Sequence, residues 1–381
     1  MMRREKILTN AWVVTPEEVF RGTVQLTDDL IHALDQGKSA LWGAEDFDGD
    51  YLLPGLIELH TDHLEKQFSP RPGIRWPSMA AILSHDASVV AAGITTVFDA
   101  LAVGDVSEDS SRLRDLQDMA GAVKTAQKQG VLRSEHLLHI RCEIAYPRVI
   151  DLFEGFSEDP LVKLVSLMDH TPGQRQFTKM EKFLQYYKGK YGLDDKQMDT
   201  LISWRQENQK KYASRHRALL VEKCRDLGIP LASHDDTTVD HITEAASDGI
   251  VISEFPTTLE AASSAHQYGL KILMGAPNLV LGGSHSGNIS ALELGKLGLL
   301  DILSSDYVPG SLIQGVFLLH EKLDMPLPKA VALVTVNPAG IVGLQDRGTI
   351  QVGKRADLIR VNMAPGLPII KKVWRGGRNV F

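Results

Sequence analysis

Short apolar runs alternate with longer amphipathic stretches between Tyr51 and Asp306, and this alternation is the feature that most restricts the fold. Each run has the length of a buried strand, and each following stretch has the charge and length of a helix with its loop. Repeated strand–helix units build parallel sheets. The runs are YLLPGLIELH, ITTVFDA, HLLHIRCE, LVKLVSLMDH, IPLASHD, GIVISEFP, LKILMG and LDILSSD. This is the number of strands that closes a TIM-like (β/α)8 barrel, so the sequence predicts an α/β barrel fold.

The two ends of the chain have a different pattern, with short strand-like runs separated by turn residues. We expect residues 1–50 and 345–381 to form a small β-sandwich module and residues 51–344 to form the barrel. One connection, 177–226, is much longer than the others and mostly helical in composition. This insertion is open to interpretation as a lid, a subunit contact or ordinary surface helices.

The composition excludes several classes of protein. The net charge is −7 and the Lys and Arg residues are scattered, so we expect no nucleic-acid surface. No segment approaches the roughly 20 apolar residues of a membrane span, and the N-terminus lacks the apolar core of a secretory signal. The expected location is cytoplasmic. The two cysteines, Cys142 and Cys224, form no Cys-x-x-Cys motif, so any metal must be bound by His and carboxylates.

Imidazoles and carboxylates stand where several predicted strands end, which is the face of a barrel that carries the chemistry. They are His60, Asp62, His63, His139, Glu143, Asp169, His170, His234, Asp235, Asp236 and Asp306. Such groups crowded together would cost several kcal/mol without a cation. Mixed nitrogen and oxygen ligands suit one or two divalent ions, with zinc preferred and manganese, iron or nickel as alternatives. Because a bound ion lowers the pKa of water from roughly 16 to about 7, hydrolysis is the expected reaction class.

Strand alternation predicts which of these side chains share a face. Residues two apart point the same way, so His60 should pair with Asp62, while His63 should turn away or lie just beyond the strand. By the same rule Arg141 and Glu143 share a face. A carboxylate at Glu143 could bridge two ions, and Arg141 could serve the substrate.

The motif PGLIELHTD, His170, His234, Asp306 and the tail NPAGIVGLQDRGTIQVGKRADL together resemble the amidohydrolase superfamily of metal-dependent hydrolases over nearly the whole chain. Members usually open with His-x-His, where this chain has His60-Thr61-Asp62, and many use a carboxylated lysine where Glu143 stands. The resemblance implies the metal ligands His60, Asp62, Glu143, His170, His234 and Asp306.

One branch of that superfamily is closer still. The stretches ELHTDHLEKQFSPRPGIRWPS, HIRCE, SLMDHTPGQRQF, ASHDD, SEFPTT, MGAPNLVLGGSHSGN and LSSDYVP resemble the alpha-D-ribose 1-methylphosphonate 5-triphosphate diphosphatases. These enzymes serve the carbon–phosphorus lyase pathway of phosphonate catabolism and release pyrophosphate from a sugar triphosphate. The resemblance implies a phosphorylated sugar substrate. This branch has Asn where the present chain has His63.

A triphosphate requires cations and close backbone N–H groups beside the metal. The loop after the first strand supplies three cations, and a Gly/Ser-rich turn follows the seventh strand, although surface cations and ordinary loop glycines are the simpler readings of each. The expected substrate contacts are His63, Lys66, Arg71, Arg75, Arg141 and His285.

Asp306 is the expected catalytic residue, because a carboxylate at the last strand end can contact both metal and water and accept a proton. Two other functions remain open: hydrolysis of a C–N bond in a cyclic amide, N-acyl amine or aromatic amine, and a non-catalytic scaffold barrel. The cationic loop favours phosphate over a neutral amide, and the set of metal-competent side chains favours an enzyme. The expected assembly is a homodimer.

Overall fold

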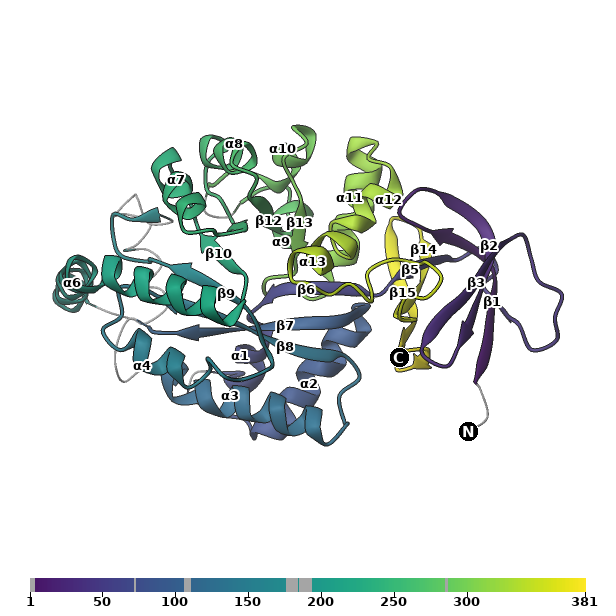
Figure 1. Cartoon of the computed structure of the whole chain (residues 1–381), viewed down its shortest axis with the longest axis horizontal. Coiled ribbons are helices and arrows are strands. Elements are labelled where there is room, and N and C mark those ends of the chain that lie inside the picture. The colour runs from purple at the N-terminus through teal and green to yellow at the C-terminus, as the bar shows by residue number, and fades with distance from the viewer. Residues whose placement is uncertain (1–3, 72, 106–110, 176–183, 185–193, 285–286) are drawn as a thin grey trace.

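The computed structural model describes residues 4–71, 73–105, 111–175, 184, 194–284 and 287–381. It contains two eight-stranded sheets, of which one is the barrel and the other is built from both termini (Figure 1). The predicted α/β barrel with a terminal β module is therefore confirmed. None of the helices in these ranges is both long enough and apolar enough to span a membrane.

The barrel strands follow one another in chain order, and every pair is parallel. They are β6 Leu56–Thr61, β7 Ile94–Val103, β8 Glu135–Glu143, β9 Val162–Met168, β10 Leu231–His234, β11 Ile252–Glu254, β12 Lys271–Gly275 and β13 Ile302–Ser304. A parallel bridge between Thr61 and Asp306 joins the last strand to the first. There the Asp306 N–H donates to the His60 carbonyl at 3.1 Å, and the Asp62 N–H donates to the Asp306 carbonyl at 3.0 Å.

The predicted first strand, 51–60, is divided at Gly55. Its first half, β5 (Tyr51–Pro54), pairs with strands of the terminal sheet, and only β6 enters the barrel. A Cβ at Gly55 would lie 2.3 Å from the Thr95 hydroxyl oxygen, so only glycine fits where the chain crosses from one sheet to the other.

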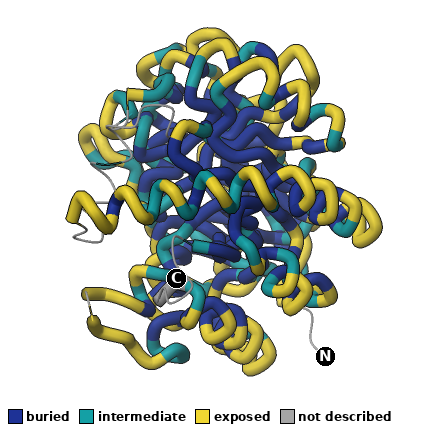
Figure 2. The backbone as a smooth tube through the Cα atoms, turned by 90° about the vertical axis from the view of Figure 1, so that its left-hand side faces the viewer, coloured by how far each residue is buried: buried dark blue, intermediate teal, exposed yellow. Residues whose placement is uncertain are grey.

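Apolar side chains fill the barrel and the layer around it. Alternate strand residues such as Ile57, Phe98 and Leu137 pack inside the barrel, and Ala339 belongs to the same apolar cluster. A larger apolar cluster lies between the strands and the surrounding helices. Figure 2 shows this arrangement as buried strands enclosed by helices that are exposed on their outer side. The polar site must therefore form where the strands end.

Helices cover the outside of the barrel, as βα repetition requires. They are α1 His63–Phe68, α2 Ser78–Ala91, α3 Ser111–Lys128, α4 Val149–Glu154, α6 Asp195–Leu227, α7 Val239–Ser247, α8 Leu259–Gln267, α9 Ala276–Val280, α10 Ala291–Lys296, α11 Ser311–Leu323, α12 Leu327–Ala332 and α13 Val336–Ile341.

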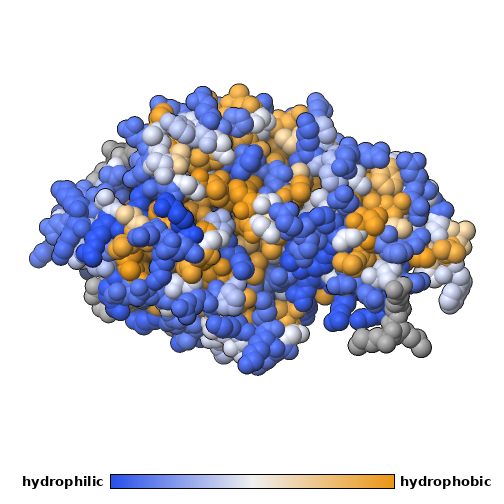
Figure 3. All heavy atoms as spheres, in the orientation of Figure 1, coloured by the Kyte–Doolittle hydropathy of each residue, from blue (hydrophilic) through white to orange (hydrophobic). Residues whose placement is uncertain are grey.

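The described part of the predicted insertion 177–226 is mainly the 33-residue helix α6; residues 177–183 and 185–193 lie outside the described residues. A capping box between Asp194 and Gln197 begins this helix, and Gly228 in the left-handed conformation ends it. Its outer surface is largely hydrophilic (Figure 3).

The terminal sheet has the order β16-β15-β14-β5-β1-β2-β3, with β4 paired to β1. Its strands are β1 Glu5–Val14, β2 Val19–Thr27, β3 Leu30–Gln36, β4 Glu45–Asp46, β5 Tyr51–Pro54, β14 Leu358–Ala364, β15 Leu367–Arg375 and β16 Arg378–Asn379. Buried Trp374 stacks on Phe47 in its own apolar core.

Candidate metal centre and active site

The Glu254 carboxylate at the end of β11 holds two histidines in the barrel mouth. His60 Nδ1 lies 2.7 Å from Glu254 Oε1, and His234 Nδ1 lies 2.8 Å from Oε2. All three side chains are buried. Because an ionised carboxylate only accepts, each imidazole donates from Nδ1, and a neutral ring then carries its lone pair on Nε2. Such carboxylate–imidazole pairs orient metal-binding histidines.

His170, which follows β9, is held in the same way. Its Nδ1 lies 2.8 Å from Glu143 Oε2, and its backbone N–H donates to Oε1 at 3.1 Å. Burial disfavours the ionised Glu143, but Arg205 and His170 outweigh it and lower the pKa of Glu143 to about 2. Gly104 makes room for this carboxylate, since a Cβ there would lie 2.8 Å from the Glu143 Cβ.

The Asp235 carboxylate lies between two of these imidazoles. Its Oδ2 is 3.6 Å from His170 Nε2 and 3.4 Å from His234 Nε2, and it has no hydrogen-bond partner among the described residues although it is buried. These separations exceed those of good hydrogen bonds. Such separations suit ligand atoms that bind the same ion, with each atom about 2 Å from the ion.

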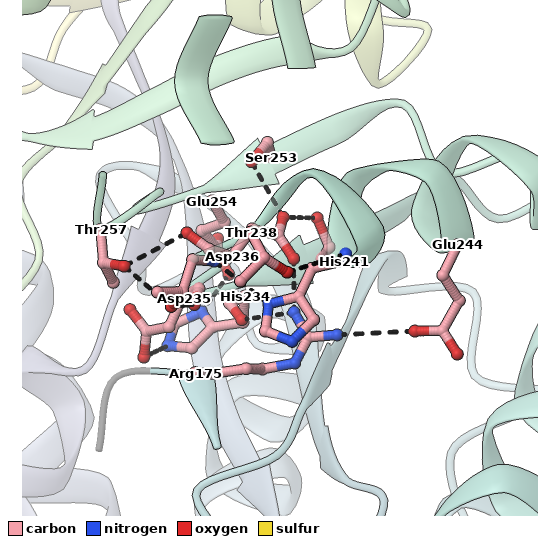
Figure 4. Close-up of polar contacts among 12 residues, drawn as sticks. Arg175, His234, Asp235, Asp236, Thr238, His241, Glu244, Ser253, Glu254 and Thr257 are labelled. Atoms are coloured by element: carbon pink, nitrogen blue, oxygen red, sulfur yellow. Dashed lines mark hydrogen bonds and ion pairs between the residues drawn. The ribbon is translucent and has the colours of Figure 1, made fainter. Parts of the chain in front are cut away.

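Backbone conformation explains how neighbouring residues reach the same space. Strand β10 ends at His234, and Asp235 has φ of 55°, in the left-handed region. Asp235 therefore leaves the strand pleat, and its carboxylate comes to the His234 ring instead of pointing to the opposite face (Figure 4). Phe255 and Asp306, which follow β11 and β13, have the same unusual conformation with φ of 54°. Such strain concentrates at functional sites.

Asp62 and Asp306 form a pair of carboxylates in the mouth. Burial and then the Asp62 charge raise the pKa of Asp306 to about 6. Asp62 Oδ1 is buried and has no hydrogen-bond partner in the described part of the chain. Two close carboxylates in a buried site repel each other, and a cation between or beside them would remove that repulsion.

His139 also lies in the mouth but is already satisfied. Its Nδ1 donates to the Leu59 carbonyl at 2.9 Å, and its Nε2 lies 3.0 Å from the Ser166 hydroxyl. Burial lowers the pKa of His139 to about 3, so the ring is neutral. It packs against His60 with ring centroids 5.2 Å apart and supports that ligand.

Two of the expected substrate contacts lie beside this centre. An Arg141 guanidinium nitrogen is 3.4 Å from His234 Nε2, and the Arg141 Nε is buried with no hydrogen-bond partner among the residues described. The Lys66 ammonium lies 4.6 Å from the ring centroid of Tyr307, the residue after Asp306. Both cations also lower the pKa of Asp306, against the larger effect of burial.

Three further expected contacts, His63, Arg71 and Arg75, belong to α1 and the loop that follows it. Arg75 is 53% exposed and pairs with Asp115 and Asp118 of α3, with 2.8 Å between its Nε and Asp115 Oδ1. Arg71 is exposed in the loop after α1. His63 begins α1, and its Nδ1 lies 2.9 Å from His85 Nδ1 of α2. His285 lies outside the described residues.

A second buried cluster of similar chemistry lies between strands β7 and β8 and helix α2. His85 Nε2 is 2.7 Å from Asp99 Oδ1, and His136 Nδ1 is 2.8 Å from Asp99 Oδ2. The second nitrogen of His136 lies 3.3 Å from Asp86, and that of His85 faces His63. Every ring nitrogen of His85 and His136 thus has a partner without a metal ion.

Sequence reasoning placed neither Asp235 nor Glu254 in the ligand set, and it missed Arg205. Glu254 could have been found, because SEFP ends the sixth predicted strand just as HTD ends the first. Asp235 stands beside His234, but strand alternation assigns it to the opposite face. Arg205 is nearly fully buried on α6 and lies 3.3 Å from Glu143 Oε1, and its position in a long charged helix carries no local signal.

The donor set fits a divalent metal centre. Two buried carboxylate oxygens, on Asp62 and Asp235, have no hydrogen-bond partner in the described ranges, and oriented imidazoles lie beside them. The group His170, His234 and Asp235 places one ligand atom each within 4.8 Å of the others. Nitrogen and oxygen donors in this mixture suit zinc and similar ions.

Comparisons with known proteins agree with this geometry. The model of the Amidohydrolase family matches residues 51–380. The alpha-D-ribose 1-methylphosphonate 5-triphosphate diphosphatase of Escherichia coli (strain K12) is 48% identical over 377 residues, which cover 98% of this chain and 100% of that protein.

Solved structures resemble the whole chain at low sequence identity. A Xaa-Pro dipeptidase with bound methionine has a TM-score of 0.65 at 14% identity, covering 99% of both chains. N-acetylglucosamine-6-phosphate deacetylase from Pasteurella multocida has a TM-score of 0.64 at 12% identity, covering 98% of this chain and 99% of that one. These likenesses concern the fold alone. With the match over residues 51–380 and the 48% identical relative, the chain belongs to the amidohydrolase family.

Proposed function

We propose that this protein is a metal-dependent hydrolase that converts alpha-D-ribose 1-methylphosphonate 5-triphosphate to the 5-phosphate and pyrophosphate. The observation that carries the proposal is 48% identity to the Escherichia coli diphosphatase over essentially the full length of both chains. The mouth of the barrel supports it, because carboxylates, oriented imidazoles and cations lie together there.

The proposed ligand set differs from the sequence prediction at two residues, Asp235 and Glu143. His60, Asp62, His170, His234 and Asp306 would hold one or two divalent ions, and Asp235 would join them. Glu143 would orient His170 without contacting the ion, since its carboxylate binds Nδ1 of that ring. When bound, the ion supplies a Lewis acid that polarises phosphoryl oxygens and lowers the pKa of water.

Asp306 would accept the proton of the attacking water, because it is the carboxylate at the end of the last strand and faces the Asp62 side of the mouth. The water oxygen bonds to the phosphorus nearest the sugar while the bond from that phosphorus to the bridging oxygen breaks. Asp306 then returns the proton as pyrophosphate leaves. Arg141 and Lys66 would hold phosphate oxygens as their negative charge shifts.

The test measures pyrophosphate release from the ribose triphosphate, with ATP and a set of cyclic amides as comparison substrates. We expect turnover of the ribose triphosphate to exceed that of ATP, with one or two equivalents of zinc, manganese, iron or nickel per chain by elemental analysis. Activity on amides alone would replace the proposal with C–N hydrolysis. Sedimentation of the same preparation tests the expected homodimer.

A further inference from the structure

A buried ion pair lies behind the His234–Asp235 turn and has no part in the proposed chemistry. Arg175, in the loop after β9, donates from one guanidinium nitrogen to Asp236 and to the His234 carbonyl, the latter at 3.1 Å (Figure 4). Arg175 is 5% exposed and Asp236 is fully buried. The guanidinium therefore touches the residues on both sides of Asp235.

The Asp236 carboxylate ties two barrel strands together. One oxygen binds Arg175, and the other accepts hydrogen bonds from the Ser233 hydroxyl and from the Ser253 hydroxyl at 2.9 Å. The Asp236 carbonyl accepts from the Thr257 N–H at 2.8 Å. Asp236 is thus connected to β10, to β11 and to the segment after β11.

These contacts flank Asp235, the residue of the turn whose backbone is in the left-handed region. Asp235 has φ of 55°, in the left-handed region, which is less favourable for an L-residue than the strand conformation. The Asp235 Oδ2 atom has no hydrogen-bond partner within the described ranges, and it lies 3.4 Å from His234 Nε2 and 3.6 Å from His170 Nε2. The backbone of Asp235 is held by its N–H, which donates to the Glu254 carbonyl at 2.9 Å, and by the Thr237 hydroxyl, which donates to its carbonyl at 3.1 Å. Arg175 and Asp236 fix the residues on either side of it.

We propose that Arg175 and Asp236 are positioning residues that keep the His234–Asp235 turn in its metal-binding conformation. The inference rests on the metal centre of the proposed function. Arg175 serves the metal site through the protein backbone and is not a contact for the triphosphate. Its burial and its pairing with Asp236 leave its charge neutralised before substrate arrives.

The test compares Arg175→Gln and Asp236→Asn with a matched control, Arg217→Gln. Arg217 is likewise 5% exposed, and it pairs with Asp248 at 2.6 Å and Glu244 at 3.3 Å. Glu244 also lies 3.8 Å from Arg175, but no hydrogen bond or ion pair of the described residues joins Arg217 to residues 234–236. Zinc affinity of each metal-free protein is measured by competition with a chromophoric chelator, and thermal unfolding is recorded in parallel. Steady-state assays give kcat and KM.

We expect Arg175→Gln and Asp236→Asn to weaken zinc binding by about 10–100-fold, as is usual when the support of a ligand is removed. Arg217→Gln should lower the unfolding temperature and leave zinc affinity within about twofold of the wild type. Added guanidinium ion should restore part of the zinc affinity of Arg175→Ala. If Arg175→Gln does not fold, Arg175→Lys replaces it, with a smaller expected loss.

Unchanged zinc affinity with a raised KM in Arg175→Gln would overturn the inference and make Arg175 a substrate contact. An equal loss of zinc affinity in Arg217→Gln would also overturn it, because the effect would then follow from any lost buried arginine. Zinc affinity is measured without substrate, so a wild-type protein that binds zinc but hydrolyses a different compound contradicts only the proposed function.

Discussion

Two clusters of imidazoles and carboxylates differ in how many of their polar atoms have hydrogen-bond partners. The wall cluster consists of His85, Asp86, Asp99 and His136, and the mouth cluster consists of His60, Asp62, His170, His234, Asp235 and Asp306. In the wall cluster each ring nitrogen has a protein partner, at 2.7–3.3 Å. In the mouth cluster two carboxylate oxygens, on Asp62 and Asp235, have no hydrogen-bond partner among the described residues. Residue types alone therefore do not identify a metal site; unsatisfied donor atoms do.

Their positions in the barrel account for the difference. Asp99 and His136 are next to Phe98 and Leu137, which point into the barrel, so strand alternation turns the charged pair outward against α2. Partners from a packed helix satisfy them. The mouth residues stand where the strands end, and there the backbone leaves the pleat.

The largest expected effect is on turnover in the mouth. Asp306→Asn keeps the shape of the side chain but removes the proton acceptor, so kcat should fall by about 10²–10⁴-fold. Metal content, measured on the same preparation, should remain near that of the wild type. A variant with full activity would exclude Asp306 as the proton acceptor.

The corresponding change in the wall should affect stability. Asp99→Asn leaves two buried imidazoles without their shared carboxylate, and we expect a loss of about 3–5 kcal/mol in the free energy of unfolding. Urea unfolding of the chelator-treated protein measures it. Zinc affinity should be unchanged, and a parallel loss of zinc would mean that the wall cluster also binds metal.

Asp235→Asn should show the opposite behaviour. Asp235 Oδ2 is buried without a hydrogen-bond partner in the described residues, so replacing the carboxylate by an amide should leave the metal-free protein about as stable as the wild type. Zinc affinity should fall by about 10–100-fold, by analogy with other changes at metal centres. A destabilised metal-free protein with normal zinc affinity would assign Asp235 a structural role like that of Asp99.

The wall cluster should also give stability a pH dependence. Burial alone would lower the pKa of His136, but Asp99 and Asp86 outweigh it and raise the pKa to about 9. The folded state thus binds this proton more tightly than the unfolded state. The contribution of this proton to stability is complete below about pH 6.5 and is lost as the pH rises through about 9. Urea unfolding of chelator-treated protein across this range should show the loss, and His136→Gln should abolish it.

The smallest effect is expected at the surface. Arg75 pairs with α3 carboxylates while half exposed, so Arg75→Gln should hardly change stability, measured by urea unfolding. The comparison variant lies in the mouth. Arg141→Gln should raise KM for the triphosphate by about tenfold, because it removes a charge-assisted contact with the substrate. An equal rise in KM for Arg75→Gln would support the sequence prediction that Arg75 contacts substrate.

The sequence alone determined the barrel and much of its polar mouth. Strand–helix alternation is a local pattern, and the rule that barrel chemistry lies at strand ends pointed to His60, His170, His234 and Asp306 without coordinates. The structure brings these residues together in the mouth. Local periodicity suffices for this because the barrel aligns the carboxyl ends of all its strands.

Only the tertiary structure decided which groups have partners. Alternation predicts that Asp235 turns away from His234, but a left-handed backbone brings its carboxylate to the His234 ring. The attachment of Glu143 to His170, the approach of Arg205 from α6 and the pairing of Arg75 with α3 all join residues far apart in sequence. Partner choice depends on which elements pack together, and the physical state of a buried charge depends on its partner, so neither can be read from a local pattern.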